Sequence, residues 1–206
     1  LDSYAYQWMA ELVTEVSGGS RFLDRPEAVL MPGSAEDVQA IVRACNKHSI
    51  QYHCFSTGWG PWAAVPSKGQ VLMDLRRMNR IIEIDEQNMF AVVEPYCVAA
   101  QLQAEAMKVG LNNHISGAGG GTSVLANACC FQGGGPDVIY FSSPQDSILS
   151  IEWVMPTGEI LQTGSMGSGL GWFCAEGPGP STQGVIRGNL GGAGGWGVVT
   201  KIAIRL

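Results

Sequence analysis

The sequence has few charged residues and no basic run. Its 206 residues include 12 lysines and arginines against 18 aspartates and glutamates, which gives a formal net charge of −6. A nucleic-acid backbone is bound by clustered lysine and arginine, so this composition excludes a nucleic-acid groove. No stretch approaches the ~18 uninterrupted apolar residues of a membrane-spanning helix, and no signal peptide is visible.

The sequence also lacks the spacings of a metal centre or a P-loop. Its six cysteines form no CxxC pair, and its three histidines, His48, His53 and His114, are too scattered to supply a ligand set. We therefore expect no metal, free thiols and a reducing compartment, the cytoplasm. The strings GKS and GKT are missing, which excludes a Walker-type phosphate site. The carboxylates Glu83, Asp85, Glu86 and Glu94 form no obvious acid–base pair, and we interpret them as solvated positions.

Glycine, in contrast, is in excess. The chain has 28 glycines, roughly twice the usual share of a globular protein. Most of them fall in the clusters GAGGGT, FQGGGP, GSMGSGLGW and GNLGGAGGWG. These clusters follow no collagen-like period and are too apolar for a flexible linker. We interpret them as loops in which the backbone itself comes close to another group.

Hydrophobic periodicity predicts an α+β fold of two lobes. Residues 1–24 form an N-terminal helical segment, with helical spacing over 2–16. A small βαβ lobe follows over about 25–76, and a larger, mainly antiparallel lobe over about 77–206. The expected strands are 25–32, 51–55, 70–75, 80–85, 90–96, the two arms of a hairpin in 147–164 and 197–206, and the expected helices are 34–49, capped by Ser34, and 98–110.

A loop short of side chains follows the strand QYHCF. It reads STGWGPW, residues 56–62, and together with Ala63 it matches the string GxGxxA. The next predicted element is a strand, whereas a dinucleotide-binding turn opens a helix, so a nicotinamide site is excluded. The glycines can instead direct consecutive N–H groups into a nest for anionic oxygens, with Ser56 and Thr57 adding hydroxyl donors. A plain structured turn, with Trp59 and Trp62 packed into the core, is the alternative.

Two further loops have the same character. Residues 117–135 carry no charge and contain Thr122, Ser123 and Asn127, and in the expected fold this loop returns to face the first one. The third loop, GGAGGWGVVT, leads directly into the last strand. Three such loops are the pattern of a clamp around a long cofactor with phosphates in its middle.

The order of these segments resembles the PCMH-type FAD-binding domain of the vanillyl-alcohol oxidase superfamily, in particular its glycolate and D-lactate dehydrogenase branch. The resemblance runs from about Arg25 to Leu206 and depends on the order of RPEAVLMPGSAEDVQAIV, VLMDLRRMNRIIEID, FAVVEPYCVAAQLQAEAMKVGL, SILSIEWVMPTGEIL and GWGVVTKIAIRL. It implies that the first two loops wrap the FAD pyrophosphate between the lobes. The implied cofactor-binding residues are Ser56, Thr57, Gly58, Trp59, Gly60, Pro61, Trp62, Gly120, Thr122, Ser123, Asn127, Asp146, Gly197, Val198 and Val199.

The sequence departs from this family at several positions. Phe55 stands where the family usually has arginine, and Cys129-Cys130 stands where a Gly-Gly pair is usual. Trp59 occupies the position at which some members attach flavin covalently through histidine, so we expect non-covalent FAD. The C-terminal substrate domain that normally follows is absent, and the chain opens on leucine, so we expect a fragment or a subunit.

The resemblance implies the FAD-binding portion of an oxidoreductase that oxidises a hydroxyl-bearing small molecule, such as a 2-hydroxy acid or an alcohol. A general base must take the hydroxyl proton, and in this family such groups come largely from the substrate domain, so we assign no catalytic residue. That domain or a partner subunit is the expected partner. An electron-transfer or assembly subunit that carries FAD without its own turnover is the alternative, and a module that has lost flavin is a third possibility.

Overall fold

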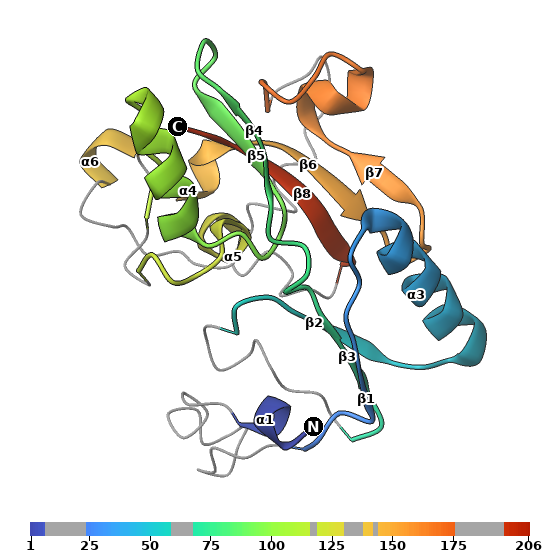
Figure 1. Cartoon of the computed structure of the whole chain (residues 1–206). Coiled ribbons are helices and arrows are strands. Elements are labelled where there is room, and N and C mark those ends of the chain that lie inside the picture. The colour runs from blue at the N-terminus through green and yellow to red at the C-terminus, as the bar shows by residue number, and fades with distance from the viewer. Residues whose placement is uncertain (7–23, 59–67, 116–118, 130–137, 142–143, 176–195) are drawn as a thin grey trace.

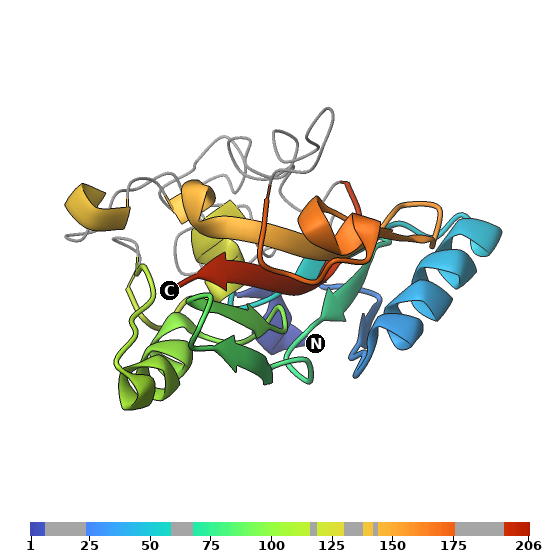
Figure 2. The ribbon, with the colours of Figure 1, turned by 90° about the horizontal axis from the view of Figure 1, so that it is seen from above.

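The computed structural model describes residues 1–6, 24–58, 68–115, 119–129, 138–141, 144–175 and 196–206. Two β-sheets lie side by side, one of three strands and one of five (Figure 1). The helix α3, Ala35–His48, lies at one end of the five-stranded sheet and α4, Ala99–Ala106, at the other, as Figures 1 and 2 both show. The mixed α+β architecture is the one predicted from the sequence.

The three-stranded sheet is parallel throughout. It contains β1, Ala28–Leu30, β2, Tyr52–Phe55, and β3, Val71–Asp74, in the order β1-β3-β2. The helix α3 connects β1 to β2, so the predicted βαβ unit is confirmed. Parallel strands need such a crossover because a tight turn would make the next strand run in the opposite direction.

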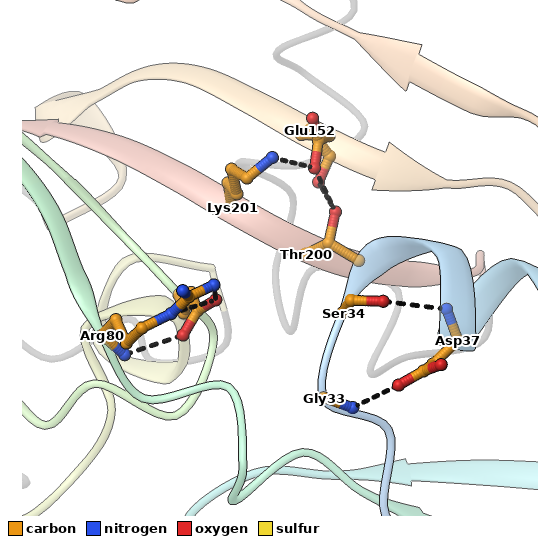
Figure 3. A network of polar contacts seen from close by, with 8 residues as sticks. Gly33, Ser34, Asp37, Arg80, Glu152, Thr200 and Lys201 are labelled. Atoms are coloured by element: carbon orange, nitrogen blue, oxygen red, sulfur yellow. Dashed lines mark hydrogen bonds and ion pairs between the residues drawn. The ribbon is translucent and has the colours of Figure 1, made fainter.

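The sequence SAED forms a reciprocal cap at the start of α3. The Ser34 hydroxyl oxygen accepts a hydrogen bond from the Asp37 N–H at 3.1 Å, and the Asp37 carboxylate accepts one from the Gly33 N–H at 2.8 Å (Figure 3). The Asp37 N–H is one of the first-turn groups that the helix itself leaves without a partner, and the bond from Gly33 fixes the residue that precedes the cap. Lys47 lies in the last turn, where its positive charge interacts favourably with the helix dipole.

The five-stranded sheet is antiparallel throughout. Its strands are β4, Ile81–Asp85, β5, Phe90–Val93, β6, Ile148–Val154, β7, Ile160–Gln162, and β8, Val198–Arg205, in the order β4-β5-β8-β6-β7. The polar break predicted between β4 and β5 is a turn in which the Asp85 carboxylate accepts hydrogen bonds from the backbone and side-chain nitrogens of Asn88. Between β6 and β8, the buried Glu152 carboxylate accepts hydrogen bonds from Thr200 and Lys201 (Figure 3).

Short helices complete the described chain. The helix α4 continues into η2, Met107–Val109, and ends at Gly110, the predicted end of this helix, which adopts a left-handed conformation. Of the predicted helix 2–16, the structure describes α1, Asp2–Ala5, and residues 7–23 lie outside the described residues. The remaining helices are α5, Val124–Cys129, α6, Val138–Phe141, η3, Pro144–Ser147, and η4, Gly164–Ser168. Among the described residues, no helix is long and apolar enough to cross a membrane.

Two apolar clusters hold the helices against the sheets and the two sheets against each other. The helices α4 and α5 pack on one face of the five-stranded sheet through Leu102, Val124 and Ile202. The second cluster joins the two sheets, because Val42 of α3 and Met73 of β3 pack against Val154 and Val198 of the larger sheet. Side chains of α3 also donate hydrogen bonds to carbonyls of the β6–β7 turn, Arg43 to Gly158 and Asn46 to Pro156. The two lobes are therefore packed and hydrogen-bonded to each other, which fixes the strands from which the loops extend.

Candidate cofactor-binding site

The first and second loops of the sequence analysis meet in the structure. The Ser123 N–H donates a hydrogen bond to the Thr57 hydroxyl oxygen at 3.0 Å. The Ser56 hydroxyl lies 3.1 Å from the Ser123 hydroxyl and 2.9 Å from the Pro95 carbonyl oxygen, which can accept its proton. Residues that are 66 and 67 positions apart in the chain thus form one polar junction at the end of β2.

The second loop is positioned by the segment that leads into α4. The Ala99 and Ala100 N–H groups donate to the carbonyl oxygens of Thr122 and Gly120, each at 2.9 Å. The Val124 N–H donates to the Cys97 carbonyl oxygen at 2.8 Å, so the loop is paired with this segment on both sides of Ser123. Backbone pairing of this kind fixes the path of a loop whatever its side chains.

Two glycines in these loops are tightly packed against their surroundings. Gly58 has φ +67°, and a Cβ there would stand 2.6 Å from the ring carbon Cζ of Phe55. A Cβ on Gly120 would stand 3.0 Å from the Cβ of Ala100. At Gly119 and Gly121 a Cβ would meet open space, so these two residues present bare backbone. Bare backbone beside tightly packed glycine is what a loop needs if an anionic group is to approach its N–H groups.

The hydroxyl groups of the junction are largely engaged within the protein. Thr122 and Ser123 are buried, and the Thr122 hydroxyl donates to the Gly119 carbonyl oxygen at 2.9 Å. The Ser123 hydroxyl accepts a hydrogen bond from the Ala126 N–H at 3.1 Å. Thr57 accepts through its oxygen and keeps its own proton to donate, whereas the Ser56 proton already has acceptors in the protein. Ser56 and Ser123 therefore join the two loops, and a phosphate contact from either of them stays a prediction.

Glu94 is buried, whereas the sequence predicted a solvated residue, so this prediction was wrong. Its side chain is buried and accepts hydrogen bonds from the Arg80 backbone N–H at 2.8 Å and from the Arg80 guanidinium at 2.7 Å. This hydrogen bond raises the pKa of Arg80. The pair holds the start of the segment 94–98, whose Pro95 carbonyl oxygen lies next to Ser56. The position of Glu94 directly after four apolar strand residues was the available signal, because a strand that ends in the core carries its next residue into the core as well.

The third loop enters β8 beside β6. Gly197 has φ +120°, and a Cβ there would lie 2.5 Å from the Trp153 indole nitrogen and would also overlap the Val154 carbonyl oxygen. Val198 packs into the cluster that joins the two sheets, and Val199 packs toward the α4–α5 cluster. Because the side chains of Val198 and Val199 pack into the core, only the backbone groups of this turn can contact a ligand.

The other predicted residues lie around this junction or outside the described part of the chain. Asn127 is buried in α5, and Asp146 is exposed in η3, which packs against α5 and precedes β6. Trp59, Gly60, Pro61 and Trp62 lie outside the described residues, as does Cys130, whereas Cys129 is buried. His114, the histidine that precedes the second loop, is buried, and the described residues contain no group of three histidines, cysteines or carboxylates placed to hold a metal ion.

Comparison with known proteins assigns the family. The FAD binding domain family matches residues 26–164. A decarboxylase of Chondromyces crocatus, 1'-carboxy-chondrochloren decarboxylase, is 34% identical over 172 residues, which are 81% of this chain and 30% of the relative. D-2-hydroxyglutarate dehydrogenase of Stutzerimonas stutzeri is 32% identical over 142 residues, 68% of this chain and 31% of the relative.

A solved structure supports the same assignment. The crystal structure of p-cresol methylhydroxylase with substrate bound superposes with a TM-score of 0.79 at 26% sequence identity, and covers 99% of this chain and 38% of that chain. The chain thus spans about a third of the length of the relatives that it matches. The expected resemblance is confirmed: the chain belongs to the FAD-binding domain family of the vanillyl-alcohol oxidase superfamily, with relatives in the 2-hydroxy acid dehydrogenase branch.

Proposed function

We propose that this chain is the FAD-binding portion of an oxidoreductase that oxidises a hydroxyl-bearing small molecule, such as a 2-hydroxy acid or an alcohol. The observation that carries the proposal is the junction of the first two loops. The Ser123–Thr57 hydrogen bond brings the Gly58 turn close to the loop that contains the open backbone of Gly119 and Gly121. Uncharged N–H groups gathered in this way suit a diphosphate in a protein whose net charge is −6.

The described residues fit FAD at this junction. Thr57, Gly58 and the open backbone of Gly119 and Gly121 would hold the phosphates, with Ser56 and Ser123 keeping the two loops in register. Bound FAD supplies a ring that accepts a hydride, while the protein supplies placement and electrostatics. Phe55 offers no cation, so the main-chain groups carry the binding of the anion. We propose non-covalent attachment because tryptophan, which forms no such bond, stands at position 59.

The substrate class follows from the relatives. The Stutzerimonas stutzeri relative is a D-2-hydroxyglutarate dehydrogenase, which supports a 2-hydroxy acid as substrate of the whole protein. The Chondromyces crocatus relative is a decarboxylase, so the experiment has to separate oxidation of a hydroxyl from loss of a carboxyl group. Because the chain spans about a third of these relatives, we propose that a substrate domain or a partner subunit supplies the catalytic base. We also propose a cytoplasmic location, which the free thiols of Cys45, Cys54 and Cys97 support.

Purified protein tests the proposal in two steps. The chain is expected to be yellow and to release intact FAD when it is denatured, since no covalent bond holds the cofactor. Anaerobic mixing with D-lactate, D-2-hydroxyglutarate or glycolate in the presence of a candidate partner chain is then expected to bleach the flavin and to yield a 2-oxo acid without carbon dioxide. The chain by itself, which lacks the proposed base, is expected to keep its flavin oxidised. A colourless protein that does not take up added FAD contradicts the proposal, and release of carbon dioxide from the same acids assigns the decarboxylase chemistry instead.

A further inference from the structure

A buried carboxylate connects the N-terminal segment to the small lobe. Asp74, the last residue of β3, is fully buried. The Tyr4 hydroxyl donates a hydrogen bond to Asp74 Oδ2 at 2.5 Å, and Arg76 donates to the same carboxylate from its side chain at 2.6 Å and from its backbone at 3.0 Å. A buried carboxylate is tolerated only with such partners, so α1 is tied to the end of β3.

The Tyr4 ring is held on two sides by the same cluster. The Arg76 guanidinium carbon lies 5.5 Å from the centre of the Tyr4 ring, within the range of a cation–π contact. The Phe55 ring meets the Tyr4 ring edge-on, with 6.0 Å between their centres and 75° between their planes. Phe55 and Asp74 are partners in the β2–β3 register, so Tyr4 spans the ends of two adjacent strands.

Phe55 in turn supports the turn that opens the first loop. Two carbons of its ring lie 2.6 and 2.7 Å from the place where a Cβ on Gly58 would stand. The ring therefore fills the space under the Gly58 backbone, and Gly58 is in the left-handed region of φ. A ring with Tyr4 on one side and Gly58 on the other has little freedom to change rotamer.

We infer that Tyr4 is a positioning residue for the cofactor site. By fixing Phe55 against Gly58, it holds the backbone of the first loop in the conformation that meets Ser123. Phe55 stands at the position where the family usually has an arginine, and it supports the loop by packing against Gly58. Tyr4 of the N-terminal segment packs against the Phe55 ring in turn. This inference rests on the proposed function for its ligand, but the contact chain from Tyr4 through Phe55 to Gly58 does not involve the cofactor.

Three variants test the inference. Tyr4→Leu removes both the ring and the hydroxyl group, Tyr4→Phe keeps the ring, and Tyr6→Leu is the matched control because Tyr6 is an exposed tyrosine two residues along the chain. FAD affinity is measured by quenching of flavin fluorescence. We expect Tyr4→Leu to raise the Kd about tenfold, Tyr4→Phe to raise it at most about threefold, and Tyr6→Leu to leave it unchanged. A merely stabilising role would lower the unfolding midpoint of Tyr4→Leu and leave the Kd of the folded protein as it was, which overturns the inference.

Hydrogen exchange separates this inference from the proposed function. In protein without added flavin, Tyr4→Leu is expected to speed amide exchange of residues 55–58, while exchange in α3 stays as in the unchanged protein. If the unchanged protein binds no FAD but residues 55–58 still depend on Tyr4, the proposed function fails and the positioning role stands. If FAD binds and neither the Kd nor the exchange responds to Tyr4→Leu, the positioning role fails and the proposed function stands.

Discussion

The N–H of Ser123 donates a hydrogen bond to the hydroxyl oxygen of Thr57 at 3.0 Å, across the gap between two loops that belong to different lobes. Ser123 lies between backbone pairings with residues 97–100 at the start of α4, and Thr57 is the second residue after β2. The bond thus links the core of the larger sheet to the edge of the smaller one. A ligand that contacts both loops would therefore depend on this hydrogen bond for the relative position of the loops.

Thr57→Val tests this link. Valine has the same shape but accepts no hydrogen bond, so the Ser123 N–H loses its partner, and we expect a loss of about 1 kcal/mol in the free energy of unfolding. FAD binding is expected to weaken about tenfold, because the two loops are no longer held in register. Urea unfolding and flavin titration measure the two effects. Thr157→Val, in the exposed β6–β7 turn, is the control, and equal FAD affinity in both variants would contradict the role of Thr57.

Gly120→Val and Gly121→Val separate packing from ligand approach. At position 120 the new side chain meets Ala100, so we expect a destabilisation of about 1–3 kcal/mol. At position 121 the side chain enters open space, and stability is expected to change by less than about 0.5 kcal/mol. Both variants are expected to lose FAD, the second because valine covers the bare backbone. Wild-type affinity in Gly121→Val would show that this backbone does not face the cofactor.

Gly197→Ala tests whether the third loop is constrained by the fold itself. Its φ of +120° is unfavourable for alanine, and the methyl group would overlap the Val154 carbonyl oxygen. We expect the free energy of unfolding to fall by about 2–4 kcal/mol even without FAD. Gly169→Ala shares a positive φ but has open space, so it is expected to lose only about 1–2 kcal/mol. Equal urea midpoints for the two variants would mean that the contact of residue 197 with β6 adds nothing to the cost of the positive φ.

Burial raises the pKa of the Cys97 thiol to about 12, with a smaller contribution from the charge of Glu94. Because the folded state favours the neutral thiol, this group stabilises the fold fully below its ordinary pKa of about 8.5 and loses that contribution as the pH rises toward 12. At pH 8, iodoacetamide is expected to leave Cys97 unmodified in folded protein and to modify it in urea. Peptide mass spectrometry reads this out, and the partly exposed Cys174 is expected to react before the buried Cys97. Rapid modification of Cys97 in folded protein would contradict its burial.

The amino-acid sequence determined the elements and the turns, because these depend on neighbours along the chain. The Ser34 cap, the end of the second predicted helix at Gly110 and the hairpin within 147–164 all lie where the local sequence predicted them. The order of these segments was also sufficient to indicate the family, since it fixes which loops lie between which strands.

Tertiary structure decided which groups meet. Spacing alone could not show that Ser56 and Thr57 would bond to Ser123, because that contact depends on the crossover of α3 and on the pairing of the second loop with the start of α4. For the same reason Glu94 was misread as solvated, and the link from Tyr4 to Phe55 was not foreseen. Local pattern sets the conformation of a segment, whereas burial and partners come from residues that are distant in the chain and adjacent only after folding.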